Sequence, residues 1–193
     1  MELVTAADLK RGQVLMLDNV PHAVEEFHIT GTAKTKRKIH ARLRNLVKGV
    51  HVERAFWEDE RLAAAEVENR RVQFSYRDGD RFVFLDAETF EELSLTAEQV
   101  GERHWFLREN EEYRAVFLEG KLLEIELPDT VAMKVESTAA PQRGGSDAAW
   151  KPARLEGGLE IMVPLFIATG DVVRVDTQTR KYVRKESETD KTR

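Results

Sequence analysis

Short segments of strand length, separated by turn residues, are the feature of this sequence that most restricts its fold. Asp18 to Pro21 and Lys48-Gly49 supply turn chemistry in the N-terminal third of the chain. The segments that they separate are residues 14–17, 22–29, 39–45 and 50–56. A short helical turn is expected after Thr5. This spacing predicts one small β-barrel.

Two further sets of strands follow a charged, alanine-rich stretch at residues 58–69. We expect that stretch to be a connector or a helical turn, and we place the first domain boundary there. Asp78-Gly79 is a type I′ hairpin signal, and Thr96 is expected to cap a short helix. Strands are predicted at residues 72–76, 81–85, 113–118, 121–127, 131–136, 159–167 and 172–176. The similar lengths of the two sets favour two related barrels, and the polar residues 186–193 predict a disordered tail.

Charge is strongly polarised along the chain, whose net charge is -5. Residues 27–52 contain no acid but carry seven cations: Lys34, Lys36, Arg37, Lys38, Arg42, Arg44 and Lys48. Residues 55–129 carry 20 acids against 9 Lys and Arg, a net of -11. We expect such a chain to meet a polyanion with one end only.

The connection between two predicted strands, residues 29–39, is the most informative stretch. It is too long and too basic for an economical hairpin turn, and four cations at one tip repel one another. A phosphate backbone would relieve that repulsion through counterion release. On charge alone, an ordinary solvated loop that binds no RNA is an equally good interpretation of this stretch. Arg42 and Arg44 alternate with Leu43 and therefore share one face of the next strand, for which a polar outer face is the simpler explanation.

Several classes of protein are disfavoured by composition. The chain has no cysteine, and no apolar run approaches the ~20 residues that span a bilayer. The N-terminus lacks a signal-peptide pattern, so a cytoplasmic protein is expected. The histidines show no metal spacing, and no nucleophile is paired with a base. We therefore expect no enzyme, no cofactor and no metal. The aromatic residues at 74, 76, 82, 84, 105 and 106 could stack on bases, but in so acidic a part of the chain they are expected to pack in a core.

The C-terminal third carries several fixed motifs in a characteristic order. They are Lys-Pro-Ala-Arg-Leu-Glu-Gly-Gly at 151–158, Val-Pro-Leu-Phe-Ile at 163–167, Gly-Asp at 170–171 and Val-Asp-Thr at 175–177. Near the N-terminus, Leu-Arg-Asn-Leu at 43–46 precedes Gly49. Together these motifs closely resemble the elongation factor P family over nearly the whole chain.

That resemblance implies both a fold and a function. The fold is all-β: an SH3-like, KOW-like domain at residues 1–65 and two OB-fold domains at 66–129 and 130–185, in an L-shaped, tRNA-like arrangement. The function is that of a non-catalytic elongation factor, expected as a monomer. It binds the 70S ribosome between the P and E sites, beside the peptidyl-tRNA, and relieves stalling at polyproline stretches.

The resemblance also assigns roles to residues. Counting back from residues 43–46 places Lys34 at the loop tip, which is often modified in the family and implies a lysine-modifying enzyme as a partner. The expected RNA contacts are Lys36, Arg37, Lys38, Arg42, Arg44, Tyr182 and Lys185. The tip departs from the family pattern, because Ala33 and Thr35 flank Lys34 where glycines are common. A paralogue with altered tip chemistry and a general OB-fold RNA-binding protein are the alternatives.

Overall fold

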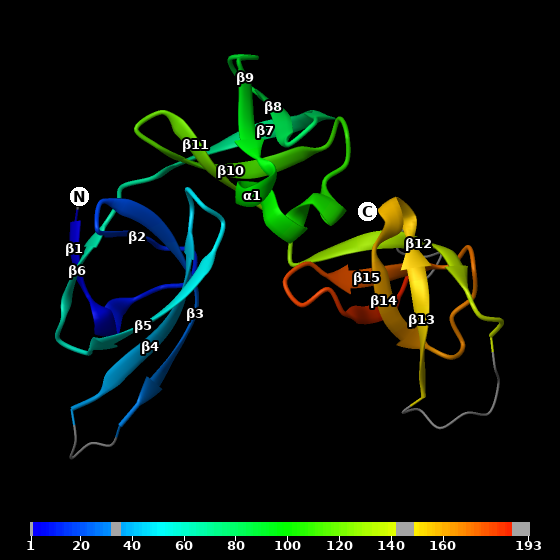
Figure 1. Cartoon of the computed structure of the whole chain (residues 1–193), viewed down its shortest axis with the longest axis horizontal. Helices are drawn as coiled ribbons and strands as arrows, with labels where there is room; N and C mark the ends of the chain where they lie inside the picture. The colour runs from blue at the N-terminus through cyan, green and yellow to red at the C-terminus, as the bar shows by residue number, and fades with distance from the viewer. Residues whose placement is uncertain (1, 32–35, 142–148, 187–193) are drawn as a thin grey trace. The chain divides into compact units, whose positions relative to one another are not determined.

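The computed structural model describes residues 2–31, 36–141 and 149–186, and most of them lie in β-strands (Figure 1). Two compact units are present. The first unit runs to Gly101 and includes Arg108–Glu126, and the second combines Glu102–Leu107 with the chain from Leu127 onward. The strands pair antiparallel in three sheets. The prediction of an all-β chain is confirmed.

The first sheet lies in the first unit and has the strand order β1-β6-β2-β3-β4-β5. Its strands are β1 (Glu2–Thr5), β6 (Arg61–Ala64), β2 (Val14–Leu17), β3 (Val20–Thr30), β4 (Lys38–Asn45) and β5 (His51–Trp57). A 3-10 turn, Ala6–Asp8, follows β1. Residues alternate in burial along β4, where Ile39, Ala41 and Leu43 face the core. The four strands predicted in this part of the chain are all present.

One prediction in this region is wrong. The stretch at residues 58–69, expected to be a connector or helical turn, contains strand β6. Leu62 and Ala64 are buried in the core of the first sheet, and β6 pairs with both β1 and β2. Alanine has little preference for strands, so this strand depends on partners at the distant N-terminus. The sequence of residues 58–69 alone contains no information about these distant partner strands.

The second sheet also belongs to the first unit, with the order β11-β10-β7-β8-β9. Its strands are β11 (Lys121–Glu126), β10 (Glu112–Leu118), β7 (Glu68–Asp78), β8 (Arg81–Asp86) and β9 (Glu92–Thr96). Phe74, Phe82 and Phe84 are buried, as predicted, but Tyr76 is 43% exposed and does not pack in the core as expected. Asp78 pairs with Arg81, so the β7–β8 turn consists of residues 79 and 80, with a positive φ at Gly79. This pattern matches a type II′ turn and corrects the predicted type I′.

A single turn of helix, α1 (Ala97–Val100), follows β9. The Thr96 hydroxyl accepts a hydrogen bond from the Gln99 amide, and the Gln99 side chain accepts one from the Thr96 amide. This reciprocal capping box satisfies two backbone donors that the helix itself leaves free. The predicted cap at Thr96 is confirmed.

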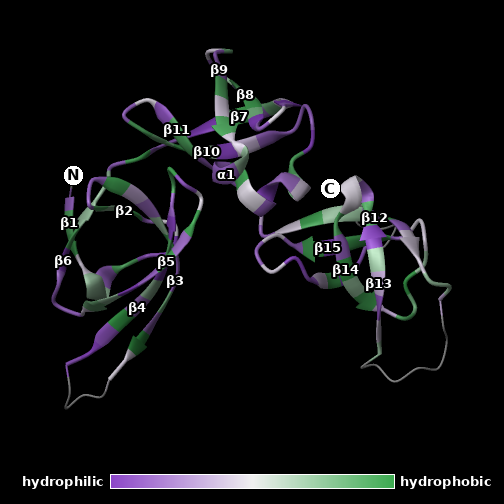
Figure 2. Cartoon of the chain, in the orientation of Figure 1, coloured by the Kyte–Doolittle hydropathy of each residue, from purple (hydrophilic) through white to green (hydrophobic). Residues whose placement is uncertain are grey.

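The third sheet forms most of the second unit, with the order β14-β13-β12-β15-β16. Its strands are β14 (Glu160–Pro164), β13 (Trp150–Leu155), β12 (Thr130–Thr138), β15 (Val172–Asp176) and β16 (Tyr182–Lys185). Phe106, from the 3-10 turn Gly101–Phe106, is buried in the core of this unit. Figure 2 shows the hydrophobic and hydrophilic residues alternating along these strands.

Candidate nucleic-acid interface

Strands β3 and β4 form a long hairpin whose end carries the basic loop (Figure 1). Their pairing continues to Thr30↔Lys38, so residues 31–37 connect them. Gly31 has a φ of 114°, and a Cβ there would come 3.1 Å from the Cα of Arg37. Glycine suits this position because other residues rarely adopt such a φ. Lys34, the predicted tip residue, lies outside the described residues.

Two of the predicted cations lie beside Trp57 and Asp59 at the base of the loop. The ammonium of Lys38 is 4.3 Å from the centroid of the Trp57 ring, and that of Lys36 is 5.7 Å from it. Lys36 also donates a hydrogen bond of 3.0 Å to Asp59 Oδ2, which lowers the pKa of that carboxyl. Exposed contacts of these kinds are weak. They orient the two ammonium groups while leaving them open to solvent.

Trp57 was not among the residues that the sequence predicted for this site, and the pairing of β4 with β5 explains its position. Trp57 pairs with Lys38 across β4 and β5, and the next pair along is Ile39 with Phe56. Because Ile39 and Phe56 are both buried, the alternation of a strand places Lys38 and Trp57 together on the outer face. The sequence could have shown this only after the register of the two strands was known.

The outer face of β4 carries polar side chains in succession from the loop inward. His40 stacks on His28 of β3, with ring centroids 5.0 Å apart and planes within 9°. The Nε2 atom of His40 lies 3.0 Å from the Thr30 hydroxyl. Arg42 follows on the same face, half exposed, with its Nε 3.7 Å from Glu25. The predicted alternation of Arg42 with buried Leu43 is therefore observed.

Arg44 corrects the predicted set of RNA contacts. Its side chain is 3% exposed and lies against the second sheet. The guanidinium donates to Glu124 Oε1 at 2.5 Å and to the carbonyl oxygen of Gln99 at 2.8 Å, and its Nε lies 3.7 Å from Glu25. In this conformation Arg44 is not accessible to RNA. The alternation of side chains along β4 correctly predicted that Arg44 shares a face with Arg42. It could not show that the second sheet covers this face at the C-terminal end of β4.

The turn that follows β4 packs against helix α1 of the second sheet. Gly49 has a φ of +71°, and a Cβ there would lie 1.8 Å from the carbonyl oxygen of Glu98. The side-chain amide of Gln99 donates to the carbonyl of Leu46 at 3.2 Å. Any side chain at position 49 would force the turn and the helix apart. Glycine is therefore required here both by conformation and by close approach.

An apolar cluster below this turn also joins the first and second sheets. Val14, Ala23 and Leu46 from the first part of the chain pack with Val116 and Leu123 from β10 and β11. Burial of these side chains stabilises the contact between the sheets, and the Arg44 hydrogen bonds give it a defined orientation. The basic hairpin thus has a fixed base within the first unit.

Arg37 is exposed beside the loop, and the last two candidates, Tyr182 and Lys185, belong to the second unit. Tyr182 is half-buried, and burial raises the pKa of its phenol. Its ring lies edge-on to Trp150, with centroids 5.9 Å apart. The ammonium of Lys185 lies 2.7 Å from Asp171 Oδ2. Lys185 is therefore an ion-paired residue, and an RNA contact would have to compete with Asp171.

This ion pair makes a testable prediction. Burial alone would raise the pKa of Asp171, but hydrogen bonds from Lys185 and the Ala168 amide outweigh it and hold that pKa below its ordinary value. Lys185→Gln is expected to raise the pKa of Asp171, as measured by carboxyl 13C NMR. Because the folded pKa is depressed, the stabilisation exists above the unfolded pKa of about 3.9 and is lost as the pH falls through the folded value. Lys185→Gln should lose less stability over that acidic range.

Lys181→Gln serves as the matched control, since Lys181 is an exposed lysine near the start of the same strand. It should leave the Asp171 titration unchanged. An identical Asp171 pKa in wild type and Lys185→Gln would mean that the pair does not persist in solution.

The described ranges 2–31, 36–141 and 149–186 lack two kinds of feature. They contain no group of three or more His, Asp or Glu side chains that could hold a metal ion. None of their helices is long and apolar enough to cross a membrane.

Comparison with known proteins identifies the family. Residues 5–62 match the elongation factor P KOW-like domain, residues 67–125 its OB domain and residues 131–185 its C-terminal domain. The chain belongs to the elongation factor P family. Elongation factor P of Synechococcus sp. (strain JA-3-3Ab) is 38% identical over 185 residues, covering 95% of this chain and 100% of that protein. Elongation factor P of Corynebacterium urealyticum is 38% identical over 182 residues, covering 94% and 97%.

Membership of the elongation factor P family confirms the resemblance drawn from the motifs and makes this chain a translation elongation factor. The KOW-like and OB domains of the predicted fold are likewise confirmed. Among solved structures, "Eukaryotic translation initiation factor 5A from Methanococcus jannaschii" is 20% identical, covers 65% of this chain and 92% of its own, and has a TM-score of 0.48.

Proposed function

We propose that this chain binds the 70S ribosome between the P and E sites and stimulates peptide-bond formation at runs of proline. The observation that carries the proposal is the basic hairpin. It presents Lys36, Arg37 and Lys38 to solvent at one end, and at its other end Arg44 and Gly49 hold it against the second sheet. A segment that orients another molecule needs such a fixed base.

The proposed mechanism is catalysis by positioning. Proline is a constrained nucleophile, so the orientation of the peptidyl-tRNA limits the reaction at proline runs. Holding two reactants in the right geometry lowers the barrier without any proton transfer. In this proposal Lys34 reaches the acceptor end of the P-site peptidyl-tRNA, and the cations behind it contact phosphates. The chain is then a non-enzymatic factor that requires no metal or diffusible cofactor.

The sequence around Lys34 bears on its modification. The residues Ala33 and Thr35 replace the glycines that commonly flank the tip lysine, which restricts the backbone. This departure favours the alternative of a paralogue with altered tip chemistry and its own lysine-modifying enzyme. Intact-mass measurement of protein from its native host, followed by mass analysis of the tryptic fragment containing position 34, distinguishes a modified from an unmodified lysine.

The remaining partners follow from the same proposal. The RNA of both ribosomal subunits and the P-site peptidyl-tRNA would be the polyanions that the basic end of the chain meets. Tyr182 and Lys185 would lie near the RNA of the small subunit. The protein would act in the cytoplasm, as a monomer.

Ribosome binding and stimulation test the proposal together. We expect the chain to cosediment with 70S ribosomes and to accelerate peptide-bond formation on a Pro-Pro-Pro template. A template without proline runs is the control, and its rate should be unchanged. A general RNA-binding protein would show no stimulation and would bind free RNA with a steep salt dependence. That result would overturn the proposal.

A further inference from the structure

The turn between β5 and β6, residues 57–60, is fixed by hydrogen bonds that do not involve the basic loop. The amide of Trp57 donates to Glu60 Oε2 at 3.0 Å, and the amide of Glu60 donates to the carbonyl oxygen of Trp57 at 3.0 Å. The carbonyl oxygen of Glu60 accepts a bond of 2.9 Å from the amide of Ala6, in the 3-10 turn that follows β1. The turn is therefore held in place independently of the loop.

The part of the basic loop that leads into β4 contacts this turn through its backbone and its side chains. The amide of Glu58 donates to the carbonyl oxygen of Arg37 at 3.1 Å. On either side of that residue, the ammonium groups of Lys36 and Lys38 lie 5.7 Å and 4.3 Å from the centroid of the Trp57 ring. The face of an indole ring attracts cations. One ring therefore holds two ammonium groups of the same loop.

Asp59 supplies a negative charge at the same place. Its Oδ2 atom accepts the 3.0 Å hydrogen bond from Lys36. Two ammonium groups that share one ring repel each other, and both the ring and the carboxylate offset that repulsion. The chain therefore relieves part of the crowding of its loop cations by itself, before any phosphate is bound.

Neither contact uses up the donors of the ammonium groups. An ammonium has three N–H donors, and the Lys36 side chain remains 63% exposed although one donor is bonded to Asp59. Lys38 is also exposed. The Trp57 ring is neutral, so a phosphate can bind the two cations while they stay over the ring. Asp59 has the same sign of charge as a phosphate, so the two compete for Lys36.

We infer that Trp57 is a positioning residue, which holds Lys36 and Lys38 in place for a phosphate-bearing ligand, and that Asp59 is an internal anion, which the phosphate displaces from Lys36. The inference deepens the proposed function and rests on it only for the ligand, which there is the peptidyl-tRNA. Substitutions at the two residues should have effects of opposite sign. Loss of Trp57 should weaken phosphate binding because the lysines must then be ordered on binding, whereas loss of the Asp59 charge should strengthen it.

The test uses the full chain and fluorescently labelled inorganic polyphosphate, with binding followed by anisotropy. Trp57→Leu is expected to weaken binding about two- to fivefold, the range for an exposed cation–π contact. The salt dependence should stay the same, because no charge is lost. Trp57→Phe retains a ring and should recover part of the affinity. Asp59→Asn should strengthen binding by up to about fivefold, the upper range for an exposed ion pair.

A double-mutant cycle separates positioning from a general structural effect. With Lys36 and Lys38 both replaced by alanine, Trp57→Leu should cause no further loss, because the ring then has no ammonium group to hold. A loss that persists in that background, wild-type affinity in Trp57→Leu, or weaker binding in Asp59→Asn would overturn the inference. So would a loss with an RNA hexamer that is absent with polyphosphate, because Trp57 would then stack on a base.

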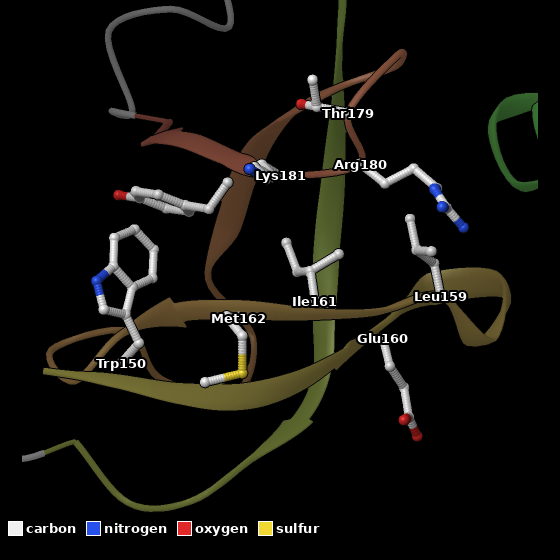
Figure 3. Close-up of a pocket in the computed structure, with 9 residues that line it drawn as sticks. Trp150, Leu159, Glu160, Ile161, Met162, Thr179, Arg180 and Lys181 are labelled. Carbon is white, nitrogen blue, oxygen red and sulfur yellow. The ribbon is translucent and has the colours of Figure 1, made fainter.

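Each substitution has a matched control. Trp150 is 47% exposed, its ring meets Tyr182 edge-on, and it lines a pocket of about 520 Å³ in the second unit (Figure 3). Trp150→Leu should therefore bind polyphosphate as wild type does. Glu58→Gln removes a negative charge from the same turn but leaves the Asp59 acceptor of Lys36 in place, so it should strengthen binding less than Asp59→Asn does. Equal gains would mean that only net charge matters and would remove the role assigned to Asp59.

The contact itself and the folding of the variants are measured on the same proteins. The ring current of Trp57 should shift the side-chain protons of Lys38 upfield in NMR spectra, and Trp57→Leu should abolish that shift. Identical Lys38 shifts in the two proteins would mean that the contact does not persist in solution. Trp57 is 44% exposed, so thermal unfolding of Trp57→Leu should match wild type, and Trp57→Phe provides a second variant if it does not.

Polyphosphate binding needs no ribosome, so this inference and the proposed function can fail separately. Opposite effects of Trp57→Leu and Asp59→Asn in a chain that does not stimulate proline-run synthesis would sustain the inference and remove the proposed function. Stimulation by a chain without these opposite effects would do the reverse.

Discussion

Lys34→Ala is expected to abolish most of the stimulation of peptide-bond formation on a Pro-Pro-Pro template. If Lys34 orients the acceptor end of the peptidyl-tRNA, its removal returns the reaction toward the unassisted rate. Misplacement of a reacting group by about 1 Å can cost up to ~100-fold, so we expect the stimulated rate to fall by about tenfold or more. The measurement is the rate of tripeptide formation under single-turnover conditions with saturating factor.

Matched variants give this prediction its specificity. Lys36→Ala and Lys38→Ala should each have a smaller effect, mainly on ribosome affinity, because each removes one exposed charge. Lys10→Ala, an exposed lysine outside the hairpin, should behave as wild type. Lys34→Arg keeps the charge but prevents lysine modification, so it separates the two contributions. Unchanged rates in Lys34→Ala and in the chain lacking the hairpin charges would end the positioning model.

Arg44→Ala is expected to destabilise the first unit by about 3–5 kcal/mol, the range for removing one partner of a buried ion pair. The substitution takes away the 2.5 Å partner of Glu124, which is 11% exposed, and the donor to the Gln99 carbonyl. Urea unfolding measures the change in the free energy of unfolding. Both losses fall on the contact that holds the basic hairpin against the second sheet.

Arg42→Ala is the natural control because Arg42 lies on the same strand and the same face but is 49% exposed. It should cost at most about 1 kcal/mol. The double variant Arg44→Met/Glu124→Leu should recover much of the stability, since apolar pairs often replace buried ion pairs at little cost. It should stimulate proline-run synthesis less than wild type does, because the hydrogen bonds that orient the hairpin are gone. Equal costs for Arg44→Ala and Arg42→Ala would refute the proposed role of Arg44.

The helix cap and the alternation of buried residues were predictable from the sequence, because each depends only on residues close together in the chain. The cap at Thr96 depends on residues three apart, and the alternation of Ile39, Ala41 and Leu43 depends on the pleat of a single strand. Strand β6 was missed because Leu62 and Ala64 become a strand only by pairing with the distant β1. The family assignment needed only motifs in order along the chain, and the comparisons confirm it.

The candidate site likewise has some features that the sequence predicts and others that depend on the tertiary structure. The sequence by itself determined the excess of cations between two strands, since charge is a property of composition, and it determined that Arg42 and Arg44 share a face. Only the tertiary structure decided that Arg42 stays half exposed while Arg44 is buried against Glu124 and Gln99. It also brought Trp57 to Lys38 and Trp150 to Tyr182. Burial and contact between distant segments depend on how sheets pack, and no pattern within a single strand encodes that packing.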